Sequence, residues 1–296
     1  MEFNWHYQAE SPTSIKSYLK QLDIPRAFTS WVKFSGGIQL NHQAVTVRKT
    51  IQAGDLLTLI TPDELGYETV VPAPEGVEVV YEDRDVLVVN KPVGIVSIPS
   101  IKNPSSSMAN RIRGYYMQQN YADQVIHIVT RLDRDTSGLM LIAKHRLAHA
   151  LLDRQIQAQQ INKIYYAISS RADWLTHGLI SAPIARDEDS IITRRVHESG
   201  KVAMTEYWLE EALKQSSLLR LQLHTGRTHQ IRVHMQHLGG PLIGDDLYGG
   251  PLVAPLMRQA LHCGELSFSQ PFTTEPIVVK QSLPSDMQEW IILNRQ

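Results

Sequence analysis

The chain has 296 residues, of which 43% are hydrophobic and 20% charged, and its formal net charge is −1 at pH 7. This composition is typical of a folded protein, and the length suits one large domain with an appendage or two domains. The single cysteine, Cys263, excludes an internal disulfide and favours a reducing compartment. No apolar run approaches the roughly 20 residues of a membrane-spanning helix, and the N-terminus lacks the apolar core of a secretory signal. We therefore expect a cytoplasmic protein.

Positive charge is concentrated in two regions of this neutral chain. Between Ser14 and Thr50, six lysines and arginines stand against one acid, Asp23. From Leu219 to Gly244, three arginines and four histidines occur without any acid. Such regions suit surfaces that contact phosphate, although two solvated faces would show the same pattern.

The first predicted elements form a compact helix–helix–hairpin unit. Residues 14–36 have the apolar spacing of two short helices, interrupted at Pro25. Residues 38–47 predict a hairpin that turns within LNHQ, and residues 50–60 predict a Gly-Asp turn followed by an apolar strand. Residues 61–76 are rich in Pro, Gly and acids and predict a linker.

The remainder of the chain predicts an α+β domain. Helical periodicity occurs in residues 106–120 and 146–160, and the second predicted helix has an apolar stripe that we expect to pack on a sheet. The members of this stripe are Leu147, Ala150, Leu151 and Ile156. Strands are predicted within residues 77–100, 162–174, 201–212 and 217–226. Because helices and strands do not alternate regularly, we expect a mixed, largely antiparallel sheet flanked by helices. The predicted domains are residues 1–72 and 73–296.

The segment from His224 to Gly249 is a candidate binding site. A strand that ends in Thr-Gly, followed by Arg227 and a helix start, would present N–H groups and cations to a phosphate. Its histidines also raise the hypothesis of a metal site, but the segment has no His-Glu-x-x-His pairing and no acidic ligand before Asp245. A phosphate-facing loop or a packed polar network is favoured, and residue spacing does not separate these two interpretations.

A second candidate is TRLDRDTSG, residues 130–138, in which Arg131 and Arg134 flank Asp133. A carboxylate beside cations remains ionised even when partly buried, and could act as a nucleophile or a base. The same residues could equally form a turn that only connects two elements.

Four ordered motifs resemble those of the RluA family of RNA pseudouridine synthases, the large-subunit ribosomal type. VTRLDRDTSGLMLIAK resembles the signature of this family, and YEDRDVLVVNKPVGIVSIPS resembles its opening Asn-Lys-Pro-x-Gly segment. NKIYYA is similar to the Lys-x-Tyr-x-Ala motif, and LHTGRTHQIRVHMQHLGGPLIGDDLYG, with RQALHC, to the C-terminal motifs. The resemblance is specific because the whole set occurs in the order of the family, over roughly residues 78–275.

The resemblance implies isomerisation of uridine to pseudouridine in RNA, in which the base leaves the ribose, turns and is rejoined through carbon. No metal or redox cofactor is implied. Asp133 matches the essential aspartate, which would add to the ribose or take a ribose proton; the sequence does not choose between these routes. Tyr165 matches the tyrosine that lies against the target base, and Arg232 matches the arginine that pairs with the aspartate and holds it ionised.

The resemblance also implies a structured RNA as the partner, with ribosomal RNA favoured and transfer RNA second. We expect Arg131, Lys163 and Arg227 to contact RNA. Two departures from the family concern RNA handling more than chemistry. Thr130 stands where most members have histidine, and the segment IVSIPS stands where Val-His-Pro is common.

Residues 1–72 resemble the small RNA-binding domain of a bacterial small-subunit ribosomal protein. Its expected RNA contacts are Lys16, Lys20, Arg26 and Lys33. We expect a monomer that does not bind membranes. The alternatives are an RNA-binding protein on a decayed synthase fold, which intact Asp133, Tyr165 and Arg232 argue against, and a metal- or phosphate-dependent hydrolase built on the histidine-rich segment.

Overall fold

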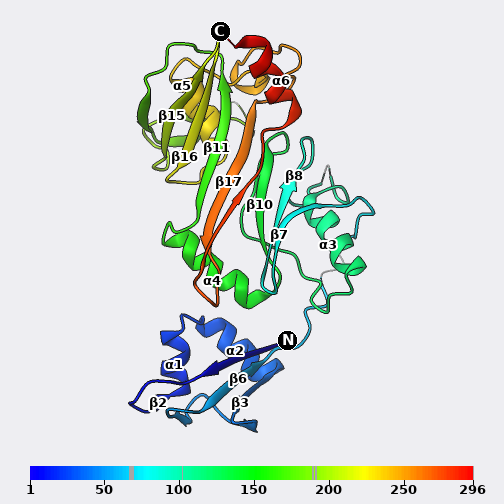
Figure 1. The fold of residues 1–296 in the computed structure, drawn as a ribbon, viewed down its shortest axis with the longest axis vertical. Coiled ribbons are helices and arrows are strands. Elements are labelled where there is room, and N and C mark those ends of the chain that lie inside the picture. Colours follow the sequence, from blue (N-terminus) through cyan, green and yellow to red (C-terminus); the bar gives the residue numbers. More distant parts are fainter. Residues whose placement is uncertain (67–69, 102, 189, 191, 296) are drawn as a thin grey trace.

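The structure, a computed structural model, describes residues 1–66, 70–101, 103–188, 190 and 192–295. A four-stranded and a ten-stranded β-sheet organise these residues, together with two smaller two-stranded sheets, and helices pack against the two larger ones (Figure 1). No helix in the described ranges has the length and apolar character that would carry it across a bilayer.

The N-terminal unit consists of a four-stranded sheet and two helices, as predicted for its helices and hairpin. Its sheet has the order β1-β6-β3-β4, with β1 at Glu2–His6, β6 at Leu56–Ile60, β3 at Gly37–Leu40 and β4 at Gln43–Ala44. The helices are α1 (Ile15–Gln21) and α2 (Arg26–Ser35), and β2 (Thr13–Ser14) pairs with β5 (Thr50–Ile51). The hairpin turns at Asn41 and His42, whose φ values of 49° and 65° suit a two-residue turn. Strand β1 was not predicted.

The large sheet has ten strands among the described residues, in the order β12-β15-β16-β11-β17-β10-β8-β7, with β18 paired to β17 and β9 to β10. The strands expected from the sequence are β7 (Glu78–Glu82), β8 (Val86–Lys91), β11 (Asn162–Ser169), β15 (Met204–Ala212) and β16 (Ser217–Leu223). The strands that were not predicted are β9 (His127–Ile128), β10 (Ser137–Ala143), β12 (His177–Ser181), β17 (Leu261–Ser269) and β18 (Pro276–Lys280). Pairing is antiparallel except between β10 and β17, so the predicted largely antiparallel α+β sheet is confirmed.

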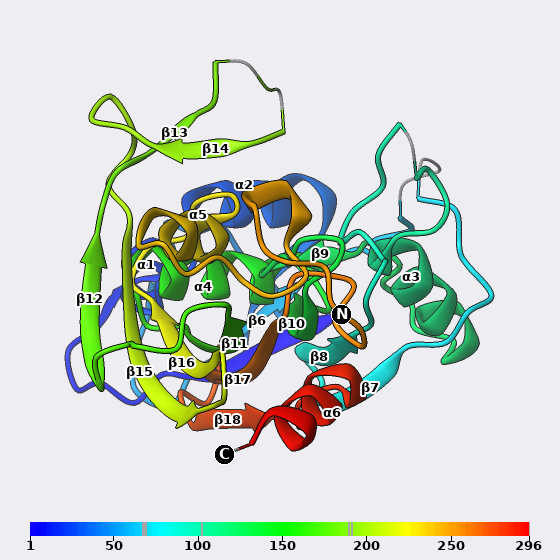
Figure 2. The same ribbon diagram turned by 90° about the horizontal axis from the view of Figure 1, so that it is seen from above.

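Helices cover both faces of the large sheet. They are α3 (Met108–Gln118), α4 (Arg146–Gln157), α5 (Gln230–His237), the 3-10 turn η1 (Asp246–Tyr248) and α6 (Ser285–Asn294). Figure 2 shows α4 and α5 on one face and α6 beside β18 on the other. A hairpin of β13 (Ile184–Arg186) and β14 (Arg194–Val196) rises on the same side as α5. The first sheet ends at Ile60 and the second begins at Glu78; the predicted linker lies between them, and its residues 67–69 are outside the described part.

The prediction that one apolar stripe of α4 packs on a sheet was wrong in part. Ala148 and Leu152 pack into the core of the large sheet, but Leu147 and Leu151 pack into the core of the N-terminal unit. Helix α4 is therefore apolar on two sides, because it lies between two cores. An aromatic contact also joins the N-terminal unit to the rest of the chain: Phe3 stacks on Phe272 with ring centroids 5.5 Å apart.

The parallel contact between β10 and β17 depends on a glycine. Gly138 lies opposite Cys263 with φ +112°, and a Cβ at this position would lie 2.3 Å from the Cys263 carbonyl oxygen. Beside it, the Ser137 hydroxyl and Nδ1 of His262 are 3.0 Å apart. This close approach holds the loop of residues 129–136, which leads directly into β10, against the centre of the sheet.

We predict that Gly138→Ala destabilises the fold by about 3 kcal/mol or more, because it adds a backbone clash to an unfavourable φ. The matched control is Gly239→Ala, which has a similar positive φ of +73° but no atom within 4 Å of the added Cβ. The control should cost only about 1 kcal/mol. Equal losses for the two variants in urea unfolding would show that the close strand approach is not the constraint.

Candidate active site

A cleft of ≈ 650 Å³ lies between the loop of residues 129–136, the segment of residues 96–100 and the turn that precedes α5. Its walls include Asp133, Tyr165 and Arg232, so the structure brings together the three residues that the sequence singled out for chemistry. Three of the expected RNA contacts also line it, namely Arg131, Lys163 and Arg227. The other four, Lys16, Lys20, Arg26 and Lys33, are exposed on α1 and α2.

The loop that carries Asp133 is held by hydrogen bonds on both sides of this residue. The Leu132 N–H donates to Ser97 Oγ at 3.0 Å, and the Ser97 hydroxyl donates to the Leu132 carbonyl at 2.7 Å. Lys91, which is fully buried, donates from Nζ to the carbonyls of Pro92, Ile95 and Arg134, each at 2.8 Å. Burial lowers the pKa of Lys91 to about 7. Three acceptors match the three donors of its ammonium group and favour the charged form.

The two departures from the family pattern both make backbone contacts in this loop. Ser97, in the segment IVSIPS, makes the reciprocal pair with Leu132 just described. Thr130 is buried in the cleft wall, where its Oγ1 accepts the Leu141 N–H at 2.9 Å. Here threonine fixes the start of the loop to β10.

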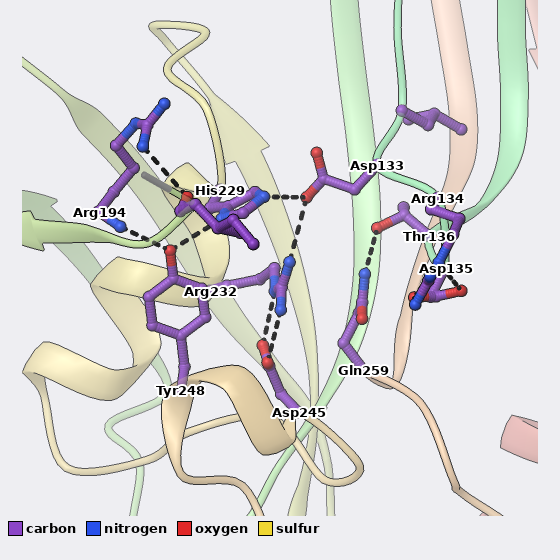
Figure 3. A network of polar contacts seen from close by, with 12 residues as sticks. Asp133, Arg134, Asp135, Thr136, Arg194, His229, Arg232, Asp245, Tyr248 and Gln259 are labelled. Carbon is purple, nitrogen blue, oxygen red and sulfur yellow. Dashed lines mark hydrogen bonds and ion pairs between the residues drawn. The ribbon is translucent and has the colours of Figure 1, made fainter. Parts of the chain in front are cut away.

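Arg232 joins two carboxylates (Figure 3). Its Nε and Nη2 each donate to Asp245 at 2.7 Å, and its Nη1 lies 3.6 Å from Oδ2 of Asp133. Arg232 and Asp245 are buried, whereas the Asp133 side chain is 32% exposed in the cleft. Burial opposes the charge on Arg232, but the hydrogen bonds and charge of Asp245, aided by Asp133, raise the pKa of Arg232 overall. The predicted pairing with Asp133 is therefore present but looser than the pairing with Asp245.

His229 is the second neighbour of Asp133. It precedes α5 in a left-handed conformation, with φ 57°, and its Nε2 lies 3.8 Å from Oδ2 of Asp133. Its Nδ1 is 2.8 Å from the hydroxyl of Tyr248, which also accepts the Arg194 N–H at 3.0 Å. Burial lowers the pKa of His229, although the charge of Asp133 opposes this shift.

Sequence reasoning missed Asp245 and Tyr248 as site residues and considered His229 only as a metal ligand. A signal for Asp245 was present, since it is the first acid after a long basic segment. Tyr248 lies in the C-terminal motif GDDLYG, but the motif does not reveal its contacts, which form when η1 folds back over α5. Its ring lies 4.9 Å from the guanidinium carbon of Arg232.

Tyr165 and Lys163 project from the same face of β11 into the cleft. The pairing of β11 with β17 shifts register between Ile164 and Tyr165, an irregularity that re-aims side chains. Tyr165 is buried, and burial raises its pKa well above the usual value, with Cys263 and Asp133 adding to the shift. Burial lowers the pKa of Lys163. Lys163 thus lies inside the cleft, whereas Arg131 and Arg227 are exposed at its rim.

Three of the four histidines of the basic segment, His224, His229 and His234, contact different groups. His224 contacts Glu206 at 2.8 Å, and His234 contacts Thr205 and the Ala182 carbonyl, both at 2.9 Å. In the part of the chain that the structure describes, no three His, Cys, Asp or Glu side chains are grouped so as to hold a metal ion. His234 and Gln230 belong to a buried polar network, whereas Gly226, Arg227 and Thr228 of the same segment line the cleft.

Comparison with known proteins identifies the class. The sequence profile of the family described as RNA pseudouridylate synthase matches residues 85–237. The chain is 43% identical over 279 residues to a Bacillus subtilis (strain 168) protein named uncharacterized RNA pseudouridine synthase YjbO, covering 94% of this chain and 98% of that protein. It is 34% identical to ribosomal large subunit pseudouridine synthase D of Pseudomonas aeruginosa, covering 90% and 86%. Among solved structures, human RNA pseudouridylate synthase domain containing 1 superposes with a TM-score of 0.58 at 27% identity, over 71% of this chain and 84% of that one.

The chain therefore belongs to the RNA pseudouridylate synthase family, and its relatives with the name of synthase D bear out the resemblance to the RluA type. It is an RNA pseudouridine synthase, an isomerase that forms pseudouridine from uridine in RNA.

We predict that Asp245→Ala destabilises the protein by about 3–5 kcal/mol, because it leaves the Arg232 guanidinium buried without its principal partner. The matched control is Asp286→Ala, which breaks a similar two-point pair with Arg258; this guanidinium is also buried, but its Nη1 keeps its hydrogen bonds to three backbone carbonyls, and Asp286 is 26% exposed. Its cost should be about 1 kcal/mol. Both values come from denaturant unfolding, and equal costs would contradict the central place of Asp245.

Proposed function

We propose that Asp133 is the catalytic carboxylate and that the cleft holds one extruded uridine of a structured RNA. The observation that carries this proposal is the position of Asp133, partly exposed in the cleft while one of its oxygens faces Arg232 and His229. The cleft volume of ≈ 650 Å³ lies in the range of small-ligand pockets, about 300–1,000 Å³. A base within folded RNA must swing out of its stack to reach such a site.

Asp133 would act on the ribose, by adding to it or by taking a proton from it, while the C–N bond to uracil breaks and the base leaves with the electron pair. The base then turns and C5 forms the new bond to the ribose, which breaks the bond to Asp133 if that carboxylate had added, or takes back the ribose proton if Asp133 had removed one. C5 then loses its own proton. Both routes use the Asp133 side chain as a carboxylate, whose Oδ2 lies 3.6 Å from Nη1 of Arg232. Tyr165 would lie against the base, and because its pKa is raised, its neutral hydroxyl is suited to passing a proton on and not to acting as a phenolate base.

The RNA would approach over the face that carries α4 and α5. Arg131 and Arg227 at the rim would meet phosphates, and Lys163 would reach the target nucleotide inside the cleft. Residues 1–72 would form a separate RNA-binding domain, with Lys16, Lys20, Arg26 and Lys33 as its contacts. Ribosomal RNA is the favoured substrate because relatives carry the name of large-subunit synthases, and transfer RNA is second. We also propose that the protein is a monomer and works in the cytoplasm.

We predict that Asp133→Asn lowers turnover by about 1,000-fold or more, because an amide neither adds to ribose nor takes its proton. The assay is tritium release from RNA labelled with [5-³H]uracil and isolated from cells that lack the gene, since C5 gives up its hydrogen on rejoining. Unfolding and RNA affinity should be unchanged. Asp135→Asn, the same change two residues along the loop, is the control and should keep its activity. If Asp133→Asn retained turnover, Asp133 would not be the catalytic carboxylate.

We also predict that the double charge reversal Lys16→Glu and Lys20→Glu weakens RNA binding, and that it reduces the slope of log affinity against log salt by about one for each phosphate that α1 no longer neutralises. Lys214→Glu with Lys280→Glu is the control, because it makes the same charge change at exposed lysines near α6 and β18, on the opposite face. Titrations of fluorescent RNA at several salt concentrations measure both effects. Identical salt slopes for the two double variants would show that α1 does not bind RNA.

A further inference from the structure

The two oxygens of Asp133 have different surroundings. Oδ2 lies 3.6 Å from Nη1 of Arg232 and 3.8 Å from Nε2 of His229. Among the residues that the structure describes, Oδ1 has no hydrogen bond or ion pair, and it faces the cleft (Figure 3). Oδ2 is thus the restrained oxygen and Oδ1 the free one. Which proton His229 carries decides whether it assists or opposes this arrangement.

A histidine near a carboxylate has two neutral tautomers with opposite effects. With its proton on Nε2, His229 donates toward Oδ2; with its proton on Nδ1, it turns a lone pair toward the same oxygen and repels it. The charged groups around the ring come from every element packed against it: Asp133 from its loop, Arg232 from α5, Arg194 from β14 and Asp245 from the segment before η1.

The contact of His229 Nδ1 with Tyr248, on the side of the ring away from Asp133, selects the tautomer. The Tyr248 hydroxyl already accepts the Arg194 N–H at 3.0 Å, so its own proton is free to donate to Nδ1 of His229 at 2.8 Å. Tyr248 is buried, and burial raises its pKa, so the phenol keeps that proton. Its ring is fixed by packing with Val233 and by the guanidinium of Arg232. This geometry favours Nδ1 as the acceptor, which places the proton of a neutral imidazole on Nε2.

We propose that Tyr248 is a positioning residue that fixes the proton of His229 on Nε2, so that a neutral imidazole points its N–H toward Oδ2 of Asp133 and leaves Oδ1 to react. This inference rests on the proposed role of Asp133. The arrangement aims two N–H groups at one oxygen, from 3.6 and 3.8 Å, while only one of them, that of Arg232, carries a positive charge. A second cation at His229 would hold the carboxylate more tightly and make it less reactive toward ribose.

The test is a double-mutant cycle, because the side chain of glutamine carries an amide N–H near the position of histidine Nε2 and has no tautomer to select. His229→Leu should lower kcat for tritium release by about ten-fold or more, and His229→Gln by no more than about three-fold. Tyr248→Phe, which keeps the ring against Arg232, should lower kcat by about ten-fold in the wild-type background but change it little in the His229→Gln background. Thermal unfolding of each variant separates an effect on activity from an effect on folding.

A spectroscopic measurement reads the tautomer directly. In protein labelled with ¹⁵N-histidine, long-range ¹H–¹⁵N correlations should show His229 protonated on Nε2 in the wild type and in Asp133→Asn, with the Nδ1 form appearing in Tyr248→Phe. The proposal is overturned if Tyr248→Phe costs the same in both backgrounds, or if its tautomer is unchanged. Those outcomes leave the role of Asp133 intact, whereas turnover in Asp133→Asn would overturn the proposed function itself.

Discussion

The buried pair of Arg232 and Asp245 is the interaction on which the site depends. A guanidinium cannot be buried without a partner at acceptable cost, and Asp245 takes both donors of one of its edges. This fixes the plane of the guanidinium and leaves Nη1 to face Asp133. Because Asp245 takes two of its donors at 2.7 Å, Arg232 turns Nη1 toward Asp133 at 3.6 Å without holding that carboxylate in a tight ion pair. A carboxylate that must react gains from such an arrangement.

The large sheet places two loops beside this pair, the loop of residues 129–136 and the turn before α5. The close parallel approach of β10 and β17 at Gly138 places the loop of Asp133 over the sheet, and Lys91 and Ser97 hold that loop through its carbonyls and N–H groups. The turn before α5 is held by Gln230, whose Oε1 accepts the Arg227 N–H at 3.0 Å. Backbone contacts therefore set the geometry of both loops. Thr130 and Ser97, which lie at the two departures from the family pattern, are among the residues that make these backbone contacts.

The N-terminal unit is attached to the same framework through α4. Leu147 and Leu151 extend into its core, while Ala148 and Leu152 pack on the large sheet. The stacked rings of Phe3 and Phe272 and the cation of Arg146, 4.5 Å from the ring of Trp31, add to the contact. An RNA held by α1 and α2 would thus be held at a defined distance from the cleft and not by a loose tether.

The sequence alone determined the class of protein, the α+β type of the large sheet, the two N-terminal helices and three residues of the site. It could do so because periodicity and ordered motifs are local patterns, and Asp133, Tyr165 and Arg232 each lie within one. It did not determine β1, the divided packing of α4, or the roles of His229, Asp245 and Tyr248. These depend on contacts between segments far apart in the chain, such as Phe3 with Phe272 or Tyr248 with Arg194. Only the tertiary structure decided which buried donor faces which acceptor, because that choice is made by the geometry of packing.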